Sequence, residues 1–198
     1  MLPQMFVSVT AIDDVLGKVE KSSLSQQTLM ELLIQNTEEK ANVCRDEASP
    51  AEATKWYGII SDKREQVTHL LWGYKSLRGS IQLEWLPLRV VSVQLNNNGF
   101  VGTVCLTELP ESLLRLSLSD NKFQGAVDLR RLPNRLELLQ LELNGFSGET
   151  DFTQLPVSLK LLNVSSTKLS GTFVERSGIH IDVFNSLVDV CTAGSKDA

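Results

Sequence analysis

The residues of this chain with the widest chemical repertoire are its two histidines and three cysteines. Two histidines, His69 and His180, are too few for a multi-histidine metal site, and neither stands in a context that suggests a nucleophile partner. The cysteines Cys44, Cys105 and Cys191 are odd in number and far apart, unlike the paired cysteines of a small secreted scaffold. We therefore expect no metal, no cofactor and no disulfide framework.

Acidic side chains offer a second route to chemistry. Asp120, Asp128 and Asp151 could be imagined as a catalytic site, but their turn and outer-strand positions favour a solvated face. The 198 residues contain no glycine-rich phosphate loop and no Gly-x-Ser-x-Gly turn. A net charge of −5 disfavours a nucleic-acid partner, and no apolar stretch is long enough to cross a bilayer. An enzyme is thus the least favoured class.

The elements that position these residues follow from a repeat, because prolines and glycines share one period of 23 residues. The prolines are Pro87, Pro110, Pro133 and Pro156, and the glycines are Gly79, Gly102, Gly125, Gly148 and Gly171. Two residue types with the same period over five units indicate a repeat architecture. The units are 67–89, 90–112, 113–135, 136–158 and an incomplete one from 159.

When the units are aligned on this period, the same residue types recur at the same positions. Apolar residues fill the first, fourth and sixth positions of each unit. The ninth position is asparagine in three units, at Asn98, Asn121 and Asn144. The eleventh position is phenylalanine in the same three units, at Phe100, Phe123 and Phe146. The pattern L-x-x-L-x-L-x-x-N-x-L resembles the leucine-rich repeat family over about residues 56–175. The motif L-x-G-x-V-x-L, which follows each asparagine, is similar to the corresponding segment of plant-type leucine-rich repeats and of protozoan repeats.

The columns also make physical sense. The fourth to sixth positions alternate like a short strand, and such strands pair in parallel because one unit cannot bury its apolar row alone. Each ninth-position asparagine can satisfy backbone groups at the turn, and the phenylalanines should form an aromatic row. After each repeated glycine, inward and outward residues alternate a second time, which predicts a short strand on the side of the coil opposite the first strand. The inward pairs would be Ile81/Leu83, Val104/Leu106, Val127/Leu129 and Thr150/Phe152.

The resemblance implies an α/β solenoid, a right-handed superhelix with a parallel concave sheet, short convex strands and a helical N-terminal cap. We expect a helical region and cap at 1–66, repeats at 67–175 and a C-terminal cap and tail at 176–198. Three helices are predicted in the first region: one near residues 12–19, one opened by a Ser23/Gln26 capping box, and one from Ser49 to about Tyr57. Residues 179–187 predict a terminal strand or short helix that covers the last coil.

The stretch Trp56-x-Gly58-Ile59 is similar to the N-terminal cap of plant-type repeats. That cap normally carries disulfide-forming cysteines, and Ser61 occupies the matching position here. The missing cysteine favours an intracellular protein, and large apolar groups at Trp72 and Trp85 could seal the cap against the stack.

The outward strand residues should line the concave face, which is the usual binding surface of such solenoids. Ten of them are the candidate partner-binding residues: His69, Leu71, Gln94, Arg115, Ser117, Leu138, Gln140, Glu142, Leu161 and Asn163. Leu138 and Leu161 should form an apolar patch with a polar rim, as protein-binding surfaces do. The alternative is that this patch packs against the chain's own tail.

Two functional hypotheses follow. The first is a non-catalytic protein-interaction module, an adaptor or structural subunit located in the cytoplasm. The alternative is a cell-surface recognition protein of the plant leucine-rich repeat kind, which sugar on the Asn163-Val164-Ser165 sequon would favour.

Overall fold

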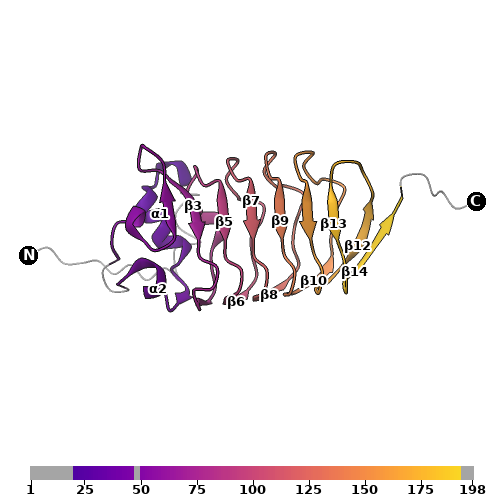
Figure 1. Cartoon of the computed structure of the whole chain (residues 1–198), viewed down its shortest axis with the longest axis horizontal. Helices are drawn as coiled ribbons and strands as arrows, with labels where there is room; N and C mark the ends of the chain where they lie inside the picture. The colour runs from indigo at the N-terminus through magenta and orange to yellow at the C-terminus, as the bar shows by residue number, and fades with distance from the viewer. Residues whose placement is uncertain (1–19, 47–49, 193–198) are drawn as a thin grey trace, which may run out of the picture.

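The protein is a solenoid whose coils stack in chain order, as shown by a computed structural model that describes residues 20–46 and 50–192 (Figure 1). Each repeat coil supplies one strand to each of two sheets, and each sheet has seven strands. The predicted solenoid with parallel sheets is confirmed.

The first sheet contains the strands predicted at the fourth to sixth repeat positions. Its order is β2 (Ile59–Ser61), β3 (Val67–Leu71), β5 (Ser92–Gln94), β7 (Arg115–Ser117), β9 (Leu138–Gln140), β11 (Leu161–Asn163) and β13 (His180–Asp182). All neighbours pair in parallel except β2, which runs antiparallel to β3. Figure 1 shows these strands side by side along the length of the molecule.

The second sheet lies on the other side of each coil. Its order is β1 (Thr37–Glu38), β4 (Arg78–Gly79), β6 (Gly99–Gly102), β8 (Lys122–Gly125), β10 (Gly145–Glu149), β12 (Lys168–Val174) and β14 (Leu187–Cys191). The predicted positions of these strands were wrong. The strands lie around the phenylalanine and glycine columns, and the residues predicted to form them come later in each coil. In the first coil those later residues include the 3-10 turn η4 (Leu83–Trp85).

The recurring glycine coincides with the end of the strand in the first three repeat coils only. Gly79, Gly102 and Gly125 are left-handed and end β4, β6 and β8, whereas Gly148 and Gly171 lie within β10 and β12. The residues after the glycines nevertheless point inward, since Leu83, Leu106 and Leu129 are buried in the core. Gly171 is needed for a further reason: at φ +129, a Cβ there would meet the Thr150 carbonyl oxygen.

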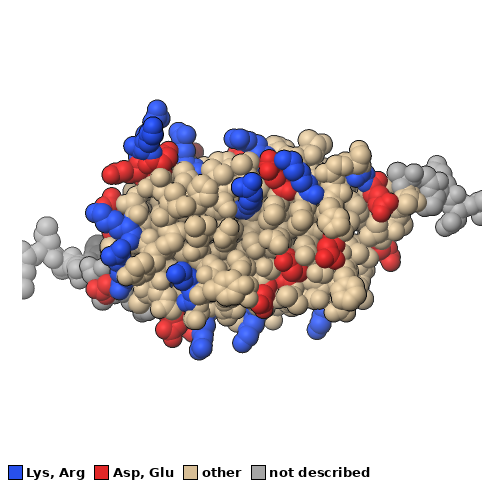
Figure 2. All heavy atoms as spheres, viewed as in Figure 1, with Lys and Arg blue, Asp and Glu red and all other residues tan. Residues whose placement is uncertain are grey.

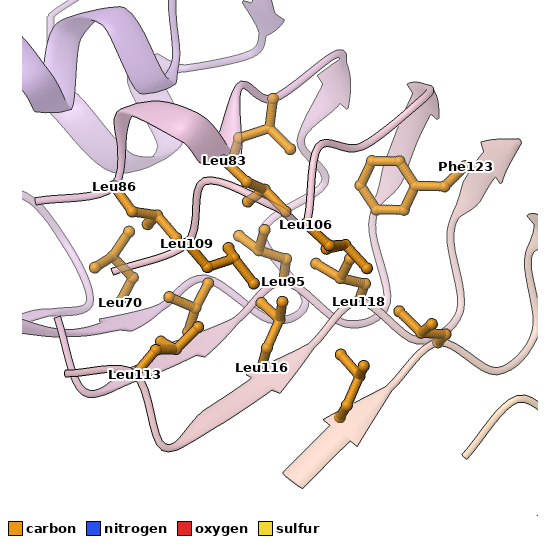
Figure 3. Packing of buried hydrophobic residues seen from close by; sticks show 14 of the residues in the cluster. Leu70, Leu83, Leu86, Leu95, Leu106, Leu109, Leu113, Leu116, Leu118 and Phe123 are labelled. Atoms are coloured by element: carbon orange, nitrogen blue, oxygen red, sulfur yellow. The ribbon is translucent and has the colours of Figure 1, made fainter. Parts of the chain in front are cut away.

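The core is a continuous apolar column inside the coils. Leucines from both sides of neighbouring coils point into the same interior, among them Leu95, Leu116 and Leu118 (Figure 3). The phenylalanine column forms the predicted aromatic row, because the Phe123 ring stacks on Phe100 at 5.8 Å and on Phe146 at 6.0 Å between centroids. Side chains from consecutive coils therefore form one core, as a solenoid requires.

The asparagine column holds neighbouring coils together through hydrogen bonds. The Asn121 Nδ2 group donates to the carbonyl oxygens of Leu118 and Ser119 in its own coil and of Leu95 in the preceding coil. Its Oδ1 accepts from the Phe100 N–H at 3.1 Å. Asn98 and Asn144 repeat the arrangement, which confirms the role predicted for this column.

Over residues 20–46 and 50–61, the N-terminal cover contains less helix than the sequence predicts there. Its elements are η2 (Lys21–Ser23), α1 (Gln26–Leu33), β1, α2 (Ala41–Cys44), η3 (Ala53–Lys55) and β2. The expected second helix exists as α1, but its N-cap is Ser25, whose Oγ accepts from the Thr28 N–H at 3.0 Å. The expected third helix is only the 3-10 turn η3, and the first lies outside the described residues.

Strands and tryptophans, rather than helices alone, cover the first coil. β1 pairs antiparallel with β4 and β2 pairs antiparallel with β3, so the N-terminal cover contributes the edge strand of each sheet at this end. Trp56 and Trp72 are buried, with their ring centroids 6.3 Å apart. The Trp72 indole N–H donates to the Tyr57 carbonyl oxygen at 2.9 Å, which ties the cover to the stack. Trp85 is half-buried against the same core.

The chain forms another, shorter coil after residue 175. β13 pairs in parallel with β11, and β14 pairs in parallel with β12, so both sheets continue. Leu162 is aligned with Ile181, 19 residues later, whereas Leu139 is aligned with Leu162, 23 residues later. The predicted terminal strand is thus β13, and it extends the stack. The boundaries predicted for the three regions remain predictions.

Candidate interaction face

The ten candidate residues come together on one side of the first sheet. Nine lie in β3, β5, β7, β9 and β11, and Glu142 follows β9 by two residues. We call the outward side of these five strands, together with the residues that follow each strand, the concave face. The binding role of the ten residues is a proposal.

The strand register orders these side chains into two rows. The first row is His69, Ser92, Arg115, Leu138, Leu161 and His180. The second row is Leu71, Gln94, Ser117, Gln140, Asn163 and Asp182. The sequence reasoning missed His180 and Asp182, because the last coil is shorter than the 23-residue period. The alternation of Ile179, Ile181 and Val183 was the signal for that strand.

Small side chains hollow out the middle of the concave face. Ser92, Ser117 and Ser119 are buried, and a hollow of about 300 Å³ lies above them. Its wall is formed by the amide side chains of Gln94, Asn96 and Gln140 and by Arg115 and Leu138. Ser92, Asn96 and Ser119 were outside the candidate set, although their small or polar side chains at outward positions could have marked the hollow.

The predicted apolar pair is present in the structure. Leu138 on β9 and Leu161 on β11 are direct cross-strand partners, and both are half-buried. Exposed Arg115 precedes them in the row, and His180 follows them. The alternative cover, the tail at 193–198, lies outside the described residues. Around the pair, polar groups form the kind of rim that protein-binding surfaces show.

Glu142 is the electrostatically unusual group of this face. Burial raises the pKa of its carboxyl group, and nearby Asp182 acts in the same direction. Gln140 Nε2 donates to Glu142 Oε1 at 3.3 Å, while Oε2 is buried and has no hydrogen-bond partner among the described residues. A raised carboxyl pKa means that the ionised carboxylate is less stable here than in water. A cation brought by a binding partner would offset that cost by pairing with the carboxylate.

Solved structures that this chain resembles include ectodomains of plant receptors. The leucine-rich repeat ectodomain of the receptor kinase SOBIR1 from Arabidopsis thaliana aligns with a TM-score of 0.61 and 19% identity, covering 84% of this chain and 95% of that one. The BIR2 ectodomain from the same plant aligns with a TM-score of 0.61 and 18% identity, covering 87% and 96%. The chain has a leucine-rich repeat fold.

A third structure with this leucine-rich repeat fold is the Arabidopsis receptor kinase HAESA, in complex with the peptide hormone IDA and the co-receptor SERK1. It aligns with a TM-score of 0.64 and 20% identity, covering 82% of this chain and 30% of that one. No family model matches the chain, and no curated protein matches it. These similarities concern the fold, and the expected likeness to protozoan repeats finds no support among them.

The other residues considered for chemistry lie elsewhere on the leucine-rich repeat. The Asp128 carboxylate pairs with Arg130 at 2.7 Å, and hydrogen bonds from Arg130 hold the Asp128 pKa well below its ordinary value. Asp151 accepts from Thr153, while Asp120 is exposed in a turn. Over residues 20–46 and 50–192, no three His, Cys, Asp or Glu side chains are grouped to bind a metal.

The three cysteines form no disulfide: Cys44 is buried, Cys105 is half-buried and Cys191 is exposed. Ser61 lies in β2 and pairs with Val67 of β3. In the part of the chain that the structure describes, no helix has both the length and the apolar character that a bilayer crossing needs.

Proposed function

We propose that this protein is a non-catalytic binding module that recognises a polypeptide partner through the concave face. The observation that carries the proposal is the continuous double row of outward side chains, with the Leu138/Leu161 pair at its apolar centre. Arg115, Gln140 and Glu142 surround that pair with donors and acceptors. An apolar centre excludes water on binding, while the polar rim fixes the orientation of the partner.

For the biological role, we propose recognition at the cell surface. This role is supported by the similar solved structures, which are receptor ectodomains. Another similar structure, the receptor kinase HAESA, was solved in complex with a peptide hormone and a co-receptor. At 18–20% identity, the likeness supports the fold and adds weight to this role without identifying a ligand.

An adaptor or structural subunit in the cytoplasm is the second candidate. It is favoured by the cysteines, because Cys44, Cys105 and Cys191 form no disulfide and because Ser61 stands where the cap that the sequence resembles would carry a cysteine. Free thiols persist in the reducing cytoplasm, whereas extracellular proteins form disulfides. Both candidates use the same concave face, so the binding proposal does not depend on the compartment.

The position of Asn163 restricts how its sequon could be used. Asn163 lies on β11 between Gln140 and Asp182, and its Oδ1 accepts from the Ser165 N–H at 2.9 Å. A sugar there would project from the middle of the concave face and obstruct a polypeptide partner. Glycosylation of Asn163 and binding over β9 and β11 are therefore mutually exclusive in our proposal.

The apolar pair provides the test of binding. We expect Leu138→Asp combined with Leu161→Asp to abolish capture of the partners that the tagged wild-type protein retains from its native cells, because two charges would face the partner's apolar contact. The fold should persist, since both leucines are outward and only half-buried. Quantitative mass spectrometry of the captured proteins measures the loss.

The matched control places the same charges on the other sheet. Val101→Asp combined with Val174→Asp alters two exposed apolar residues of β6 and β12 and should leave capture unchanged. Thermal unfolding followed by circular dichroism verifies that both double variants are folded. If the Leu138/Leu161 variant retained the same partners as wild type, the concave-face proposal would be wrong.

A further inference from the structure

The hollow in the middle of the concave face has a floor of serines. Ser92, Ser117 and Ser119 line it and are only 3%, 7% and 9% exposed. The Ser117 and Ser119 hydroxyls hydrogen-bond to each other at 3.3 Å. The Ser92 hydroxyl has no hydrogen-bond partner among the residues that the structure describes. Because buried hydroxyls are normally hydrogen-bonded, Ser92 offers an unsatisfied donor to a group that enters the hollow.

The wall of the hollow carries further unused donors. Among the described residues that line it, Arg115 alone is charged. Its guanidinium forms no ion pair or hydrogen bond within the described part of the chain, and the same holds for the carboxamides of Gln94 and Asn96. A guanidinium presents five N–H donors and no acceptor. The hollow therefore combines one positive charge with an excess of hydrogen-bond donors.

The carboxylates of the concave face lie away from this hollow. Neither Glu142 nor Asp182 is among the residues that line it. Glu142 comes four residues after Leu138, the cross-strand partner of Arg115, which is about 13 Å of extended strand. Asp182 lies three strands beyond β7, on β13. Figure 2 shows few charged side chains over the middle of the molecule, so the charge of Arg115 is not offset by close neighbours.

We propose that this hollow binds an aspartate or glutamate side chain of the polypeptide partner, an inference that rests on the proposed function of the concave face. The carboxylate pairs with the Arg115 guanidinium, whose planar fork matches its two oxygens, and accepts a hydrogen bond from the Ser92 hydroxyl. Leu138 is the neighbour of Arg115 in the first row, so the acidic side chain enters beside the apolar contact.

The size and charge of the hollow favour a carboxylate. Pockets for small-molecule ligands measure about 300–1,000 Å³, so a hollow of about 300 Å³ suits a side chain better than a whole small molecule. A phosphorylated side chain carries a charge of about −1.5 to −2. One arginine would leave part of that charge uncompensated, whereas it matches the single charge of a carboxylate.

Selection of random linear peptides displayed on phage, with the full chain immobilised, tests the charge of the occupant. Peptides retained by wild type should share an aspartate or glutamate at one position. Arg115→Glu should reverse this preference and select lysine or arginine there, because the reversed charge repels a carboxylate and attracts a cation. The matched control is Arg131→Glu, which reverses an exposed arginine outside the hollow and should keep the acidic preference.

Titration of one selected peptide by fluorescence anisotropy measures the contact itself. Arg115→Ala, or replacement of the peptide's acidic residue by its amide, should each raise Kd about 10- to 100-fold, as expected for a hydrogen bond to a charged group. The two changes together should raise Kd little further, because both remove the same pair. Ser92→Ala should raise Kd about two- to tenfold. Thermal unfolding should match wild type for Arg115→Ala, since this side chain is exposed.

The outcomes separate this inference from the proposed function. Selected peptides without a shared acidic position, an acidic preference that Arg115→Glu leaves unchanged, or a selection that retains no peptide overturns the inference. In each case the proposed function stands as long as Leu138→Asp combined with Leu161→Asp loses its native partners. If that double variant keeps them, the proposed function itself fails.

Discussion

Phe123→Ala is expected to lower the free energy of unfolding by about 3–5 kcal/mol, the usual cost of removing a buried phenylalanine. The Phe123 side chain is 0% exposed and stacks on Phe100 and Phe146, so it fills the core where three coils meet. Its removal would leave a cavity and weaken the contacts of its coil with both neighbours at once. Equilibrium denaturation followed by far-ultraviolet circular dichroism measures the change.

The control is the next residue in the same strand. Gln124 is exposed on β8, so Gln124→Ala should change the free energy of unfolding by no more than about 0.5 kcal/mol. If Phe123→Ala were equally harmless, the aromatic row would not be part of a shared core. Because each coil contacts only its neighbours, a broadened or two-step transition in Phe123→Ala would show that the stack had separated at this coil.

The second large effect is expected from Asn121→Ala, which should cost about 2–4 kcal/mol of unfolding free energy. Alanine removes the three hydrogen bonds that the Asn121 carboxamide donates to carbonyl oxygens of two coils. It also leaves the Phe100 N–H without its Oδ1 acceptor in a buried place. An unsatisfied buried backbone group costs about 1–3 kcal/mol, in addition to the hydrogen bonds lost.

Asn134→Ala is the corresponding control. Asn134 is exposed, and its backbone N–H donates to Glu111 Oε2 at 3.4 Å, a hydrogen bond that alanine preserves. We expect its denaturation midpoint to match wild type, as for most surface substitutions. Equal midpoints for the Asn121 and Asn134 variants would contradict the role assigned to the asparagine column.

The sequence predicted the features that repeat. The columns of leucine, asparagine and phenylalanine each have one physical environment, and the structure confirms a buried core, a hydrogen-bonding ladder and an aromatic row. The outward residues followed from the same alternation, because a strand points alternate side chains to opposite faces. The sequence could therefore identify which residues share the concave face, although it could not show which of them bind.

Features that occur once were harder to predict. The Ser49-Pro50-Ala51-Glu52 pattern predicted a helix, yet only the short turn η3 forms, and there the Ala53 N–H donates to Gln27 Oε1 of α1. A contact with another element thus decided the local structure. The last coil was missed because it is shorter than the period. The hollow above Ser92 and Ser117 depends on small side chains from separate coils, which only the strand register brings together.

The most direct measurement of the central claim, that the partner binds the concave face, is side-chain footprinting of the captured complex. Carbene labelling followed by mass spectrometry compares the labelled fraction of each side chain with and without the bound partner. The account predicts that labelling falls at Leu138 and Leu161 and stays unchanged at Val101 and Val174 on the second sheet. Unchanged labelling at Leu138 and Leu161, with protection at Val101 and Val174, would contradict it.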